Sequence, residues 1–131
     1  MKRIQVAAAI IIHKDRILCV QRGENQLAYI SKKFEFPGGK IEEGELPEET
    51  VLREIQEELN MEIEVRNQFV TVEHAYPDFH LTMQSFICST KSKDLRLAEH
   101  ISFKWLTRDK LDDLDWAAAD LPIVEALKNK S

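Results

Sequence analysis

The chain alternates between uninterrupted apolar runs and short polar segments. Two apolar runs, 6–12 and 17–20, flank the polar tetrapeptide 13–16, and this pattern predicts a β-hairpin. Because no polar residue interrupts either run, we expect at least one strand of this hairpin to be buried on both faces. Further segments with strand-like patterns are 34–36, 68–75, 81–88 and 101–106. We expect these strands to form one mixed sheet.

Residues 47–59 have the signature of an α-helix. They begin with a proline and two glutamates, which suit the first turn of a helix. Val51, Ile55 and Leu59 recur at helical spacing and predict an apolar stripe, with Leu52 beside it. This stripe is expected to dock on the sheet.

Residues 121–127 predict a second, amphipathic helix near the C-terminus. Strands mixed with two helices in this order predict an α+β fold, an α/β/α sandwich with a mixed β-sheet between helices. A length of 131 residues fits one domain, 1–131. Cys19 and Cys88 both fall in apolar strand-like runs, so we expect reduced core cysteines and a cytoplasmic protein.

The net charge of −5 excludes several classes of partner. A nucleic-acid polymer usually needs a basic stripe, and an anionic membrane surface needs a basic patch. No apolar run approaches the roughly 20 residues of a membrane span. We therefore expect no nucleic-acid polymer and no membrane among the partners, and a monomer by default.

The acidic residues are unevenly distributed. Eight glutamates and a single basic residue, Arg53, fall between positions 42 and 58. Glu54, Glu57 and Glu58 stand at i, i+3 and i+4, so a helix places their carboxylates on one side, where like charges repel. A hard divalent cation would turn that repulsion into binding, and carboxylate oxygens suit Mg²⁺, with Mn²⁺ as a substitute.

The loop before this helix is rich in glycine. Gly38 and Gly39 follow Pro37 and permit a close approach of the backbone to other atoms. Such a loop can also expose a carbonyl oxygen as a further hard ligand. The loop and the acidic helix are therefore expected to act together.

The spacing of these residues resembles a known signature. Gly39, Glu45 and the run Arg-Glu-Ile-Gln-Glu-Glu-Leu-Asn-Met at 53–61 match the Nudix box, Gly-x5-Glu-x7-Arg-Glu-U-x-Glu-Glu-x-Gly-U, where U is a bulky aliphatic residue. Asn60 stands where the family usually has glycine, and we expect it to end the helix in a left-handed conformation. The segments FEFPGGKIEEG (34–44) and YPDFH (76–80) further resemble the MutT-like branch of the Nudix hydrolases.

This resemblance implies a fold, a reaction and a set of roles. The box at 39–61 would form a loop-helix-loop motif in a Nudix fold. The enzyme would hydrolyse a small nucleoside triphosphate to the monophosphate and pyrophosphate with Mg²⁺. Arg53 would orient the glutamates, while Gly39 and Glu45 would support the box. The implied metal ligands are Glu54, Glu57, Glu58 and the carbonyl of Gly38.

The resemblance also implies a general base, for which there is one candidate outside the box and one inside it. Glu99, before the last strand, falls where MutT-like proteins often place a metal ligand or base. Glu54 is the rival for the base, and a solvated loop acid is the alternative interpretation of Glu99. These alternatives stay open at the level of sequence.

Three residues fall where MutT-like proteins bind the base: Arg22, Tyr76 and Asp120. Each has a simpler interpretation, namely a surface charge, a turn aromatic and a helix cap. Residues 117–122 resemble CTP pyrophosphohydrolases, and an ionised Asp120 would accept a hydrogen bond from the cytosine amine. We therefore expect a preference for CTP, dCTP or a modified dCTP. The alternatives are an 8-oxo-dGTP diphosphatase and a non-catalytic nucleotide-binding module.

Overall fold

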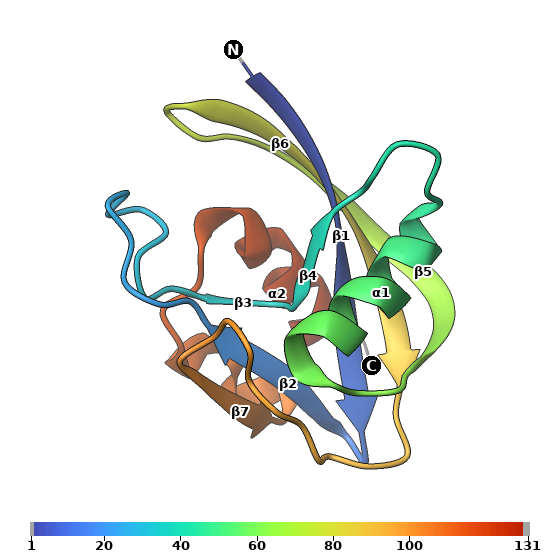
Figure 1. The fold of residues 1–131 in the computed structure, drawn as a ribbon. Coiled ribbons are helices and arrows are strands. Elements are labelled where there is room, and N and C mark those ends of the chain that lie inside the picture. Colours follow the sequence, from blue (N-terminus) through green and yellow to red (C-terminus); the bar gives the residue numbers. More distant parts are fainter. Residues whose placement is uncertain (1, 130–131) are drawn as a thin grey trace.

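Within residues 2–129, which the computed structural model describes, seven strands form one mixed sheet (Figure 1). The strands are β1 (Lys2–His13), β2 (Arg16–Gln21), β3 (Phe34–Glu35), β4 (Gly38–Lys40), β5 (Glu64–Ala75), β6 (Phe79–Ser89) and β7 (Ser102–Leu106). β1 runs parallel to β6 and antiparallel to β2 and β4. The long antiparallel pair β5–β6 and the pairs of β2 with β3 and β7 complete the sheet.

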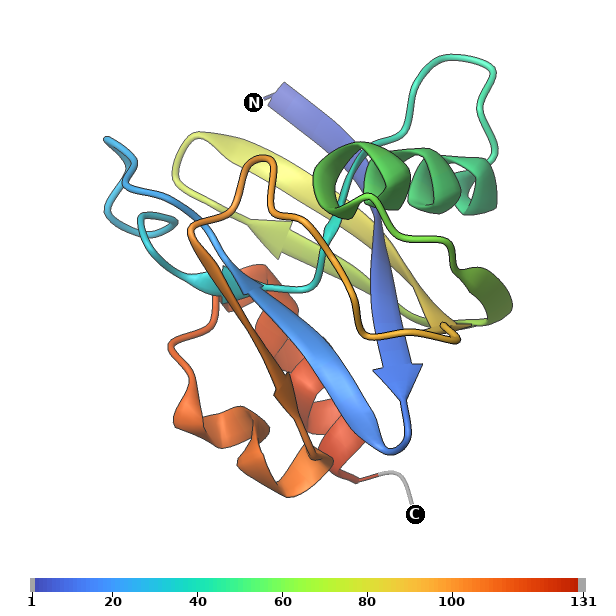
Figure 2. The same ribbon diagram turned by 60° about the horizontal axis from the view of Figure 1, so that its bottom comes forward.

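Helices lie on both sides of this sheet. Figure 2 shows α1 (Pro47–Leu59) and α2 (Leu121–Lys128) on opposite sides, with the strands between them. Two short 3-10 helices, Arg108–Asp113 and Ala118–Asp120, lead into α2. The predicted α/β/α sandwich is confirmed. No helix in the described part of the chain is long and apolar enough to cross a membrane.

Strand β1 explains why its apolar run has no polar interruption. Successive side chains of a strand point to opposite faces. Ala7, Ala9 and Ile11 belong to the buried cluster that α1 covers, while Ala8 and Ile10 belong to the cluster that α2 covers. All five residues are at most 2% exposed, so this strand is buried on both faces as predicted.

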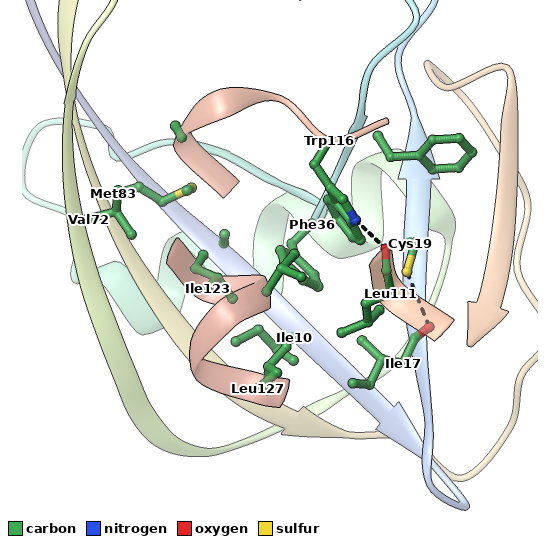
Figure 3. Close-up of a cluster of buried hydrophobic side chains, with 14 of the residues drawn as sticks. Ile10, Ile17, Cys19, Phe36, Val72, Met83, Leu111, Trp116, Ile123 and Leu127 are labelled. Carbon is green, nitrogen blue, oxygen red and sulfur yellow. Dashed lines mark hydrogen bonds between the residues drawn. The ribbon is translucent and has the colours of Figure 1, made fainter. Parts of the chain in front are cut away.

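The cluster on the α2 side joins distant parts of the chain (Figure 3). Phe36 stacks on Trp116 with 4.7 Å between the ring centroids. The Trp116 indole donates a hydrogen bond to the carbonyl of Leu111 at 2.7 Å. These contacts hold the segment after β3 against the segment that precedes α2.

Helix α1 begins and ends at the residues that the sequence predicts. The backbone N–H of Leu46 donates to the side chain of Glu49, which caps the first turn. Asn60 ends the helix with φ 53° and ψ 42°, the left-handed conformation expected of it, and its N–H donates to the carbonyl of Gln56 at 3.0 Å. The helix therefore ends at a defined residue without a glycine.

The apolar stripe of α1 is narrower than predicted. Val51, Ile55 and Leu59 are fully buried, but Leu52 is 45% exposed. A helix turns by about 100° per residue, so Leu52 lies beside Val51 on the solvent side of the contact with the sheet. The placement of Leu52 beside the core stripe was wrong.

The two cysteines lie on opposite faces of the sheet. Cys19 belongs to the cluster beneath α2, and Cys88 belongs to the cluster beneath α1. Both are free thiols, and burial raises the pKa of each to about 12. The expectation of reduced core cysteines is confirmed.

The strand boundaries differ from the expected ones at several points. β1 begins at Lys2 rather than at residue 6, and β5 begins at Glu64 rather than at residue 68. The short strand β4 was not expected, because its glycine-rich sequence carries no strand pattern. It forms by backbone pairing, in which Gly38 lies opposite Ala8 and Gly39 opposite Ala7. This pairing fixes the glycine loop on the centre of the sheet.

Candidate active site

A cavity of about 760 Å³ lies between the glycine loop, the acidic side of α1 and the segment before α2. Its walls come from β1, β6, the loop after β2, segment 35–40, α1 and segment 117–120. Six carboxylate side chains line it: Glu24, Glu35, Glu54, Glu58, Glu99 and Asp120. The cavity thus gathers residues that are far apart in the sequence.

Arg53, in the middle of α1, is the centre of an ion-pair network that joins the helix to the loop before it. Its Nε and its terminal nitrogen bind Glu45 at 2.8 and 3.0 Å, and its other terminal nitrogen binds Glu54 at 2.7 Å. The Thr50 hydroxyl donates to Glu45 at 2.6 Å. These bonds, above all those from Arg53, lower the pKa of Glu45 to about 2. Glu45 therefore holds Arg53, and Arg53 in turn holds Glu54.

Glu54 rests directly on the glycine loop. A Cβ added to Gly39 would lie only 2.3 Å from Oε2 of Glu54, so this carboxylate fills the space that a side chain at position 39 would need. The side chain of Glu54 is 17% exposed and lines the cavity. Gly39 and Glu54, which are 15 positions apart in the sequence, are thus in direct contact.

Glu58 is the most deeply buried acid of the helix. It is 4% exposed, and its Oε1 has no hydrogen-bond partner within residues 2–129. Burial, followed by a hydrogen bond with Glu54 and the charges of Glu54, Glu99 and Glu35, raises the pKa of Glu58 to about 10. Burying a carboxyl group with an unpaired oxygen costs free energy unless the group binds a cation or a proton.

Glu57 and Glu99 are placed differently from these two acids. The Glu57 side chain is 59% exposed, bonds to Arg53 at 3.4 Å and does not belong to the lining of the cavity. Glu99 is exposed on the loop between β6 and β7, yet it lines the cavity. The structure therefore brings Glu54, Glu58 and Glu99 together and leaves Glu57 at the rim of the acidic group.

The donor set fits a hard divalent cation. Glu54 and Glu58 supply carboxylate oxygens, one of them buried and unpaired, and Gly38 lines the same cavity. Among the described residues, no three His, Cys, Asp or Glu side chains already converge in a metal-binding cluster. Binding of an ion would therefore require these side chains to turn toward it.

Asp120 lies in the wall of the cavity near β3. It is 5% exposed, and its Oδ1 accepts a hydrogen bond from the backbone N–H of Phe36 at 3.0 Å. It precedes α2 but makes no side-chain capping bond, so the alternative interpretation as a helix cap is wrong. Burial, followed by the negative charge of Glu35, raises the pKa of Asp120 well above its usual range. The carboxyl group is therefore neutral over a wider pH range than that of an exposed aspartate.

Tyr76 adds an aromatic wall to this part of the cavity. Its hydroxyl accepts a hydrogen bond from the N–H of Ala119 at 3.0 Å, and its ring stacks on Tyr29 with centroids 5.2 Å apart. Phe79, whose ring lies 5.0 Å away, also lines the cavity and was not expected there. The Tyr29 hydroxyl donates to Asp78 and so ties the loop after β2 to the turn between β5 and β6.

Two polar residues of the cavity were missed by sequence reasoning. Glu35 in β3 binds Arg22 at 3.2 Å and His100 at 3.0 Å. Glu35 and His100 are 65 positions apart, and no local pattern indicates that they meet. Only the alternation of strand β3, which buries Phe34 and Phe36 on one face, could have indicated that Glu35 points to the other face.

The comparison with known families explains this arrangement. A model of the NUDIX domain matches residues 7–126. The chain belongs to the Nudix family. Its Nudix box therefore comprises the glycine loop, α1 and the Arg53 network described above, and the expected MutT-like resemblance is confirmed. As a Nudix hydrolase, the chain is an enzyme that acts on phosphoric anhydrides.

Individual relatives support the same assignment. An 8-oxo-dGTP diphosphatase of Escherichia coli is 32% identical over 128 residues, which cover 98% of each protein. A CTP pyrophosphohydrolase of the same organism is also 32% identical, over 96% of this chain and 92% of that protein. The crystal structure of a MutT protein from Methanosarcina mazei superimposes with a TM-score of 0.87 at 24% identity and covers 99% of this chain and 97% of that one. This Nudix hydrolase thus shares the MutT fold along almost its whole described length.

Proposed function

We propose that this Nudix hydrolase is a Mg²⁺-dependent nucleoside triphosphate pyrophosphohydrolase whose preferred substrate is 8-oxo-dGTP. It would convert the triphosphate and water to the monophosphate and pyrophosphate. Similarity to the E. coli 8-oxo-dGTP diphosphatase along 98% of both proteins supports the reaction. Further relatives named 8-oxo-dGTP diphosphatase come from Proteus vulgaris and Haemophilus influenzae.

The observation that carries the proposal is the distribution of acids in one cavity. Glu54, Glu58 and Glu99, with Glu57 at their rim, would form the cation-binding group, whereas Asp120 is a separate, buried acid beside aromatic side chains. A nucleoside triphosphate likewise has two chemically different parts. Its phosphates need cations, and its base needs an apolar wall with a few polar groups. The two groups of acids therefore suit the two parts of one substrate.

A neutral Asp120 can select an oxidised guanine. A protonated carboxyl group has one O–H donor and retains acceptor capacity. The oxidised base presents an N7–H donor beside the O6 acceptor, so both atoms could pair with Asp120, whereas unmodified guanine presents acceptors at both positions. The raised pKa of Asp120 therefore supports a preference for 8-oxo-dGTP over dGTP.

A cytosine nucleotide is the second candidate, because the same carboxyl group could donate to N3 and accept from the N4 amine. The CTP pyrophosphohydrolase of E. coli supports this reading. The expected preference for cytosine rested on an ionised Asp120, however, and the burial of this residue removes that premise. The aromatic walls at Tyr76 and Phe79 also offer stacking area that suits the larger purine.

The roles of the residues follow from their positions. Glu54, Glu57 and Glu58 would hold Mg²⁺ together with the Gly38 carbonyl. Mn²⁺ could substitute for Mg²⁺ at this site. When bound, the cation neutralises phosphate charge and lowers the pKa of a coordinated water. Arg53 would fix the orientation of Glu54 through the 2.7 Å ion pair. Either Glu99 or Glu54 would accept the proton of the attacking water.

A substrate panel tests the proposal. The value of kcat/KM is measured with Mg²⁺ for 8-oxo-dGTP, dGTP, CTP, dCTP and 5-methyl-dCTP, with pyrophosphate as the detected product. The proposal expects 8-oxo-dGTP to be the best substrate. A faster turnover of the cytosine nucleotides would favour the second candidate. If none of the panel is hydrolysed while nucleotides still bind, both proposed substrates are wrong.

A further inference from the structure

Glu35 joins two parts of the cavity, Arg22 in the loop after β2 and His100 in the loop before β7. We infer that Glu35 is a positioning residue, which fixes Arg22 on one side and the loop that carries Glu99 on the other. This inference rests on the proposed function, because it concerns how that reaction is organised. Glu35 itself needs to touch neither the cation nor the reacting phosphate.

The contacts of Glu35 divide between its two oxygens. Oε1 accepts a hydrogen bond from Arg22 at 3.2 Å, and Oε2 lies 3.0 Å from Nε2 of His100. Glu35 is 19% exposed and His100 only 5% exposed, so solvent competes little for the second bond. Charge-assisted bonds of this kind are stronger than neutral ones.

The bond to His100 bears directly on Glu99. The loop from residue 90 to residue 101 runs past the C-terminal end of α1 (Figure 2). Ala98 donates its N–H to the carbonyl of Glu58, and Ile101 donates its N–H to the carbonyl of Gln21, both at 3.0 Å. Between these two backbone anchors, the side chain of His100 is the tie that holds the backbone next to Glu99. Without it, only the backbone anchors at Ala98 and Ile101 would hold Glu99 in place.

The pairing also determines which nitrogen of His100 carries hydrogen. A carboxylate oxygen accepts hydrogen bonds, so in this contact Nε2 of His100 is the donor to Glu35. Nδ1 of His100 is buried and has no partner among residues 2–129, so a protonated Nδ1 would be costly. A glutamine at position 35 that kept its oxygen on Arg22 would turn an N–H toward Nε2 and force the other tautomer. The carboxylate at this position is therefore needed for both contacts at once.

Glu35 also lies within electrostatic reach of both groups of acids in the cavity. Its charge contributes to the raised pKa of Glu58 and to that of Asp120. Its place in short strand β3, which pairs with β2, keeps this charge fixed between them.

The experiment separates the two contacts by steady-state kinetics on the best substrate of the panel. Replacing Arg22→Met is expected to raise KM with little change in kcat, and His100→Phe is expected to lower kcat with little change in KM. Glu35→Ala should show both effects, each of roughly tenfold, in the range known for supporting residues. In the double variant Glu35→Ala/His100→Phe, kcat should be no lower than in Glu35→Ala alone, because the two residues act as one unit.

A second measurement tests the position of the loop without catalysis. Hydrogen exchange of the Ala98 and Ile101 amides is expected to accelerate in Glu35→Ala and in His100→Phe, because the span between their anchors is released. Lys33→Met is the matched control: it removes the ion pair between Lys33 and Asp115 outside the cavity and should change neither exchange nor kinetics.

The possible results are distinguishable. Additive losses in the double variant together with unchanged amide exchange would overturn the role of Glu35. A wild-type protein that hydrolyses no nucleotide of the panel would defeat the proposed function instead. In that case the amide exchange alone decides whether Glu35 positions the loop.

Discussion

The carboxylate of Glu54 fills the space beside Gly39 in which any other residue would carry its Cβ. That atom would lie 2.3 Å from Oε2 and 2.4 Å from Cδ of Glu54. The clash involves the end of a flexible side chain rather than backbone. A larger residue at position 39 would therefore displace the glutamate without breaking the fold.

We expect Gly39→Ala to fold normally and to lose roughly 10- to 100-fold in kcat, because a shifted Glu54 no longer presents its oxygens correctly. Steady-state kinetics with Mg²⁺ and thermal melting measure the two properties. The comparison variant is Gly38→Ala, whose Cβ would lie 2.0 Å from the backbone oxygen of Ala7. Because that backbone belongs to β1, Gly38→Ala should lower Tm. Wild-type kcat in Gly39→Ala would show that the contact does not position Glu54.

The acidic helix should be essential for turnover but not for folding. Glu54→Gln and Glu57→Gln are each expected to lower kcat by roughly a hundredfold or more, since each removes a charged oxygen from the cation-binding group. Glu48→Gln, at an exposed position of the same helix, serves as the control and should keep wild-type activity. Excess EDTA should abolish turnover, and Mg²⁺ should restore it. Turnover that resists EDTA, or wild-type rates in Glu54→Gln and Glu57→Gln, would contradict a metal site on this helix.

The planar fork of Arg53 is not replaceable by lysine. Two nitrogens of Arg53 bind Glu45 and a third binds Glu54. An ammonium group cannot make these contacts together, so Arg53→Lys should lower kcat roughly tenfold and reduce Tm. Arg66→Lys, in an exposed ion pair with Glu64, is the control and should leave both quantities near the wild-type values. Equal effects of the two substitutions would refute the role of the fork.

The neutral state of Asp120 predicts a dependence on pH. The pKa of Asp120 is raised in the folded protein, so its proton is present at low pH and is lost as pH rises through the folded value. The KM for 8-oxo-dGTP should therefore rise with pH in the wild type. In Asp120→Asn this dependence should disappear, because an amide donates at every pH. Asp115→Asn, on the surface, should keep the wild-type profile.

The same shift has a consequence for stability. The unfolded chain releases the Asp120 proton near pH 3.8, whereas the folded chain retains it to higher pH. The contribution of Asp120 to the free energy of unfolding is therefore fully present below pH 3.8. It declines as pH rises through the pKa that Asp120 has in the folded protein. Asp120→Asn should lack this decline in urea unfolding at a series of pH values. A parallel pH profile of stability in the wild type and Asp120→Asn would argue against a protonated Asp120.

The predictable part of the structure is the part that depends on local patterns. Helix α1 was bounded correctly at Pro47 and Leu59, because proline, capping and Asn60 are signals within a few residues of the helix ends. The burial of β1 on both faces followed from its uninterrupted apolar run. Leu52 was misplaced, because helical spacing alone does not determine how wide a contact with the sheet is.

The unpredictable part depends on contacts between distant segments. Asp120 meets the Phe36 amide across 84 positions, and Glu35 meets His100 across 65. Neither pair leaves a periodic trace in the sequence, since each residue looks like an ordinary polar residue in its own segment. The resemblance to the Nudix box identified the acidic helix, but the polar residues outside the box became visible only when the sheet brought the segments together.

Strand β1 limits how this enzyme can change its choice of substrate. Ala8, opposite Gly38, belongs to the α2 cluster, and its neighbour Ala7, opposite Gly39, belongs to the α1 cluster. A larger side chain at either alanine would change the cavity wall and displace the glycine loop at the same time. New specificity is therefore more accessible through the loop after β2 and through segment 117–120, which can vary while β1 stays constant.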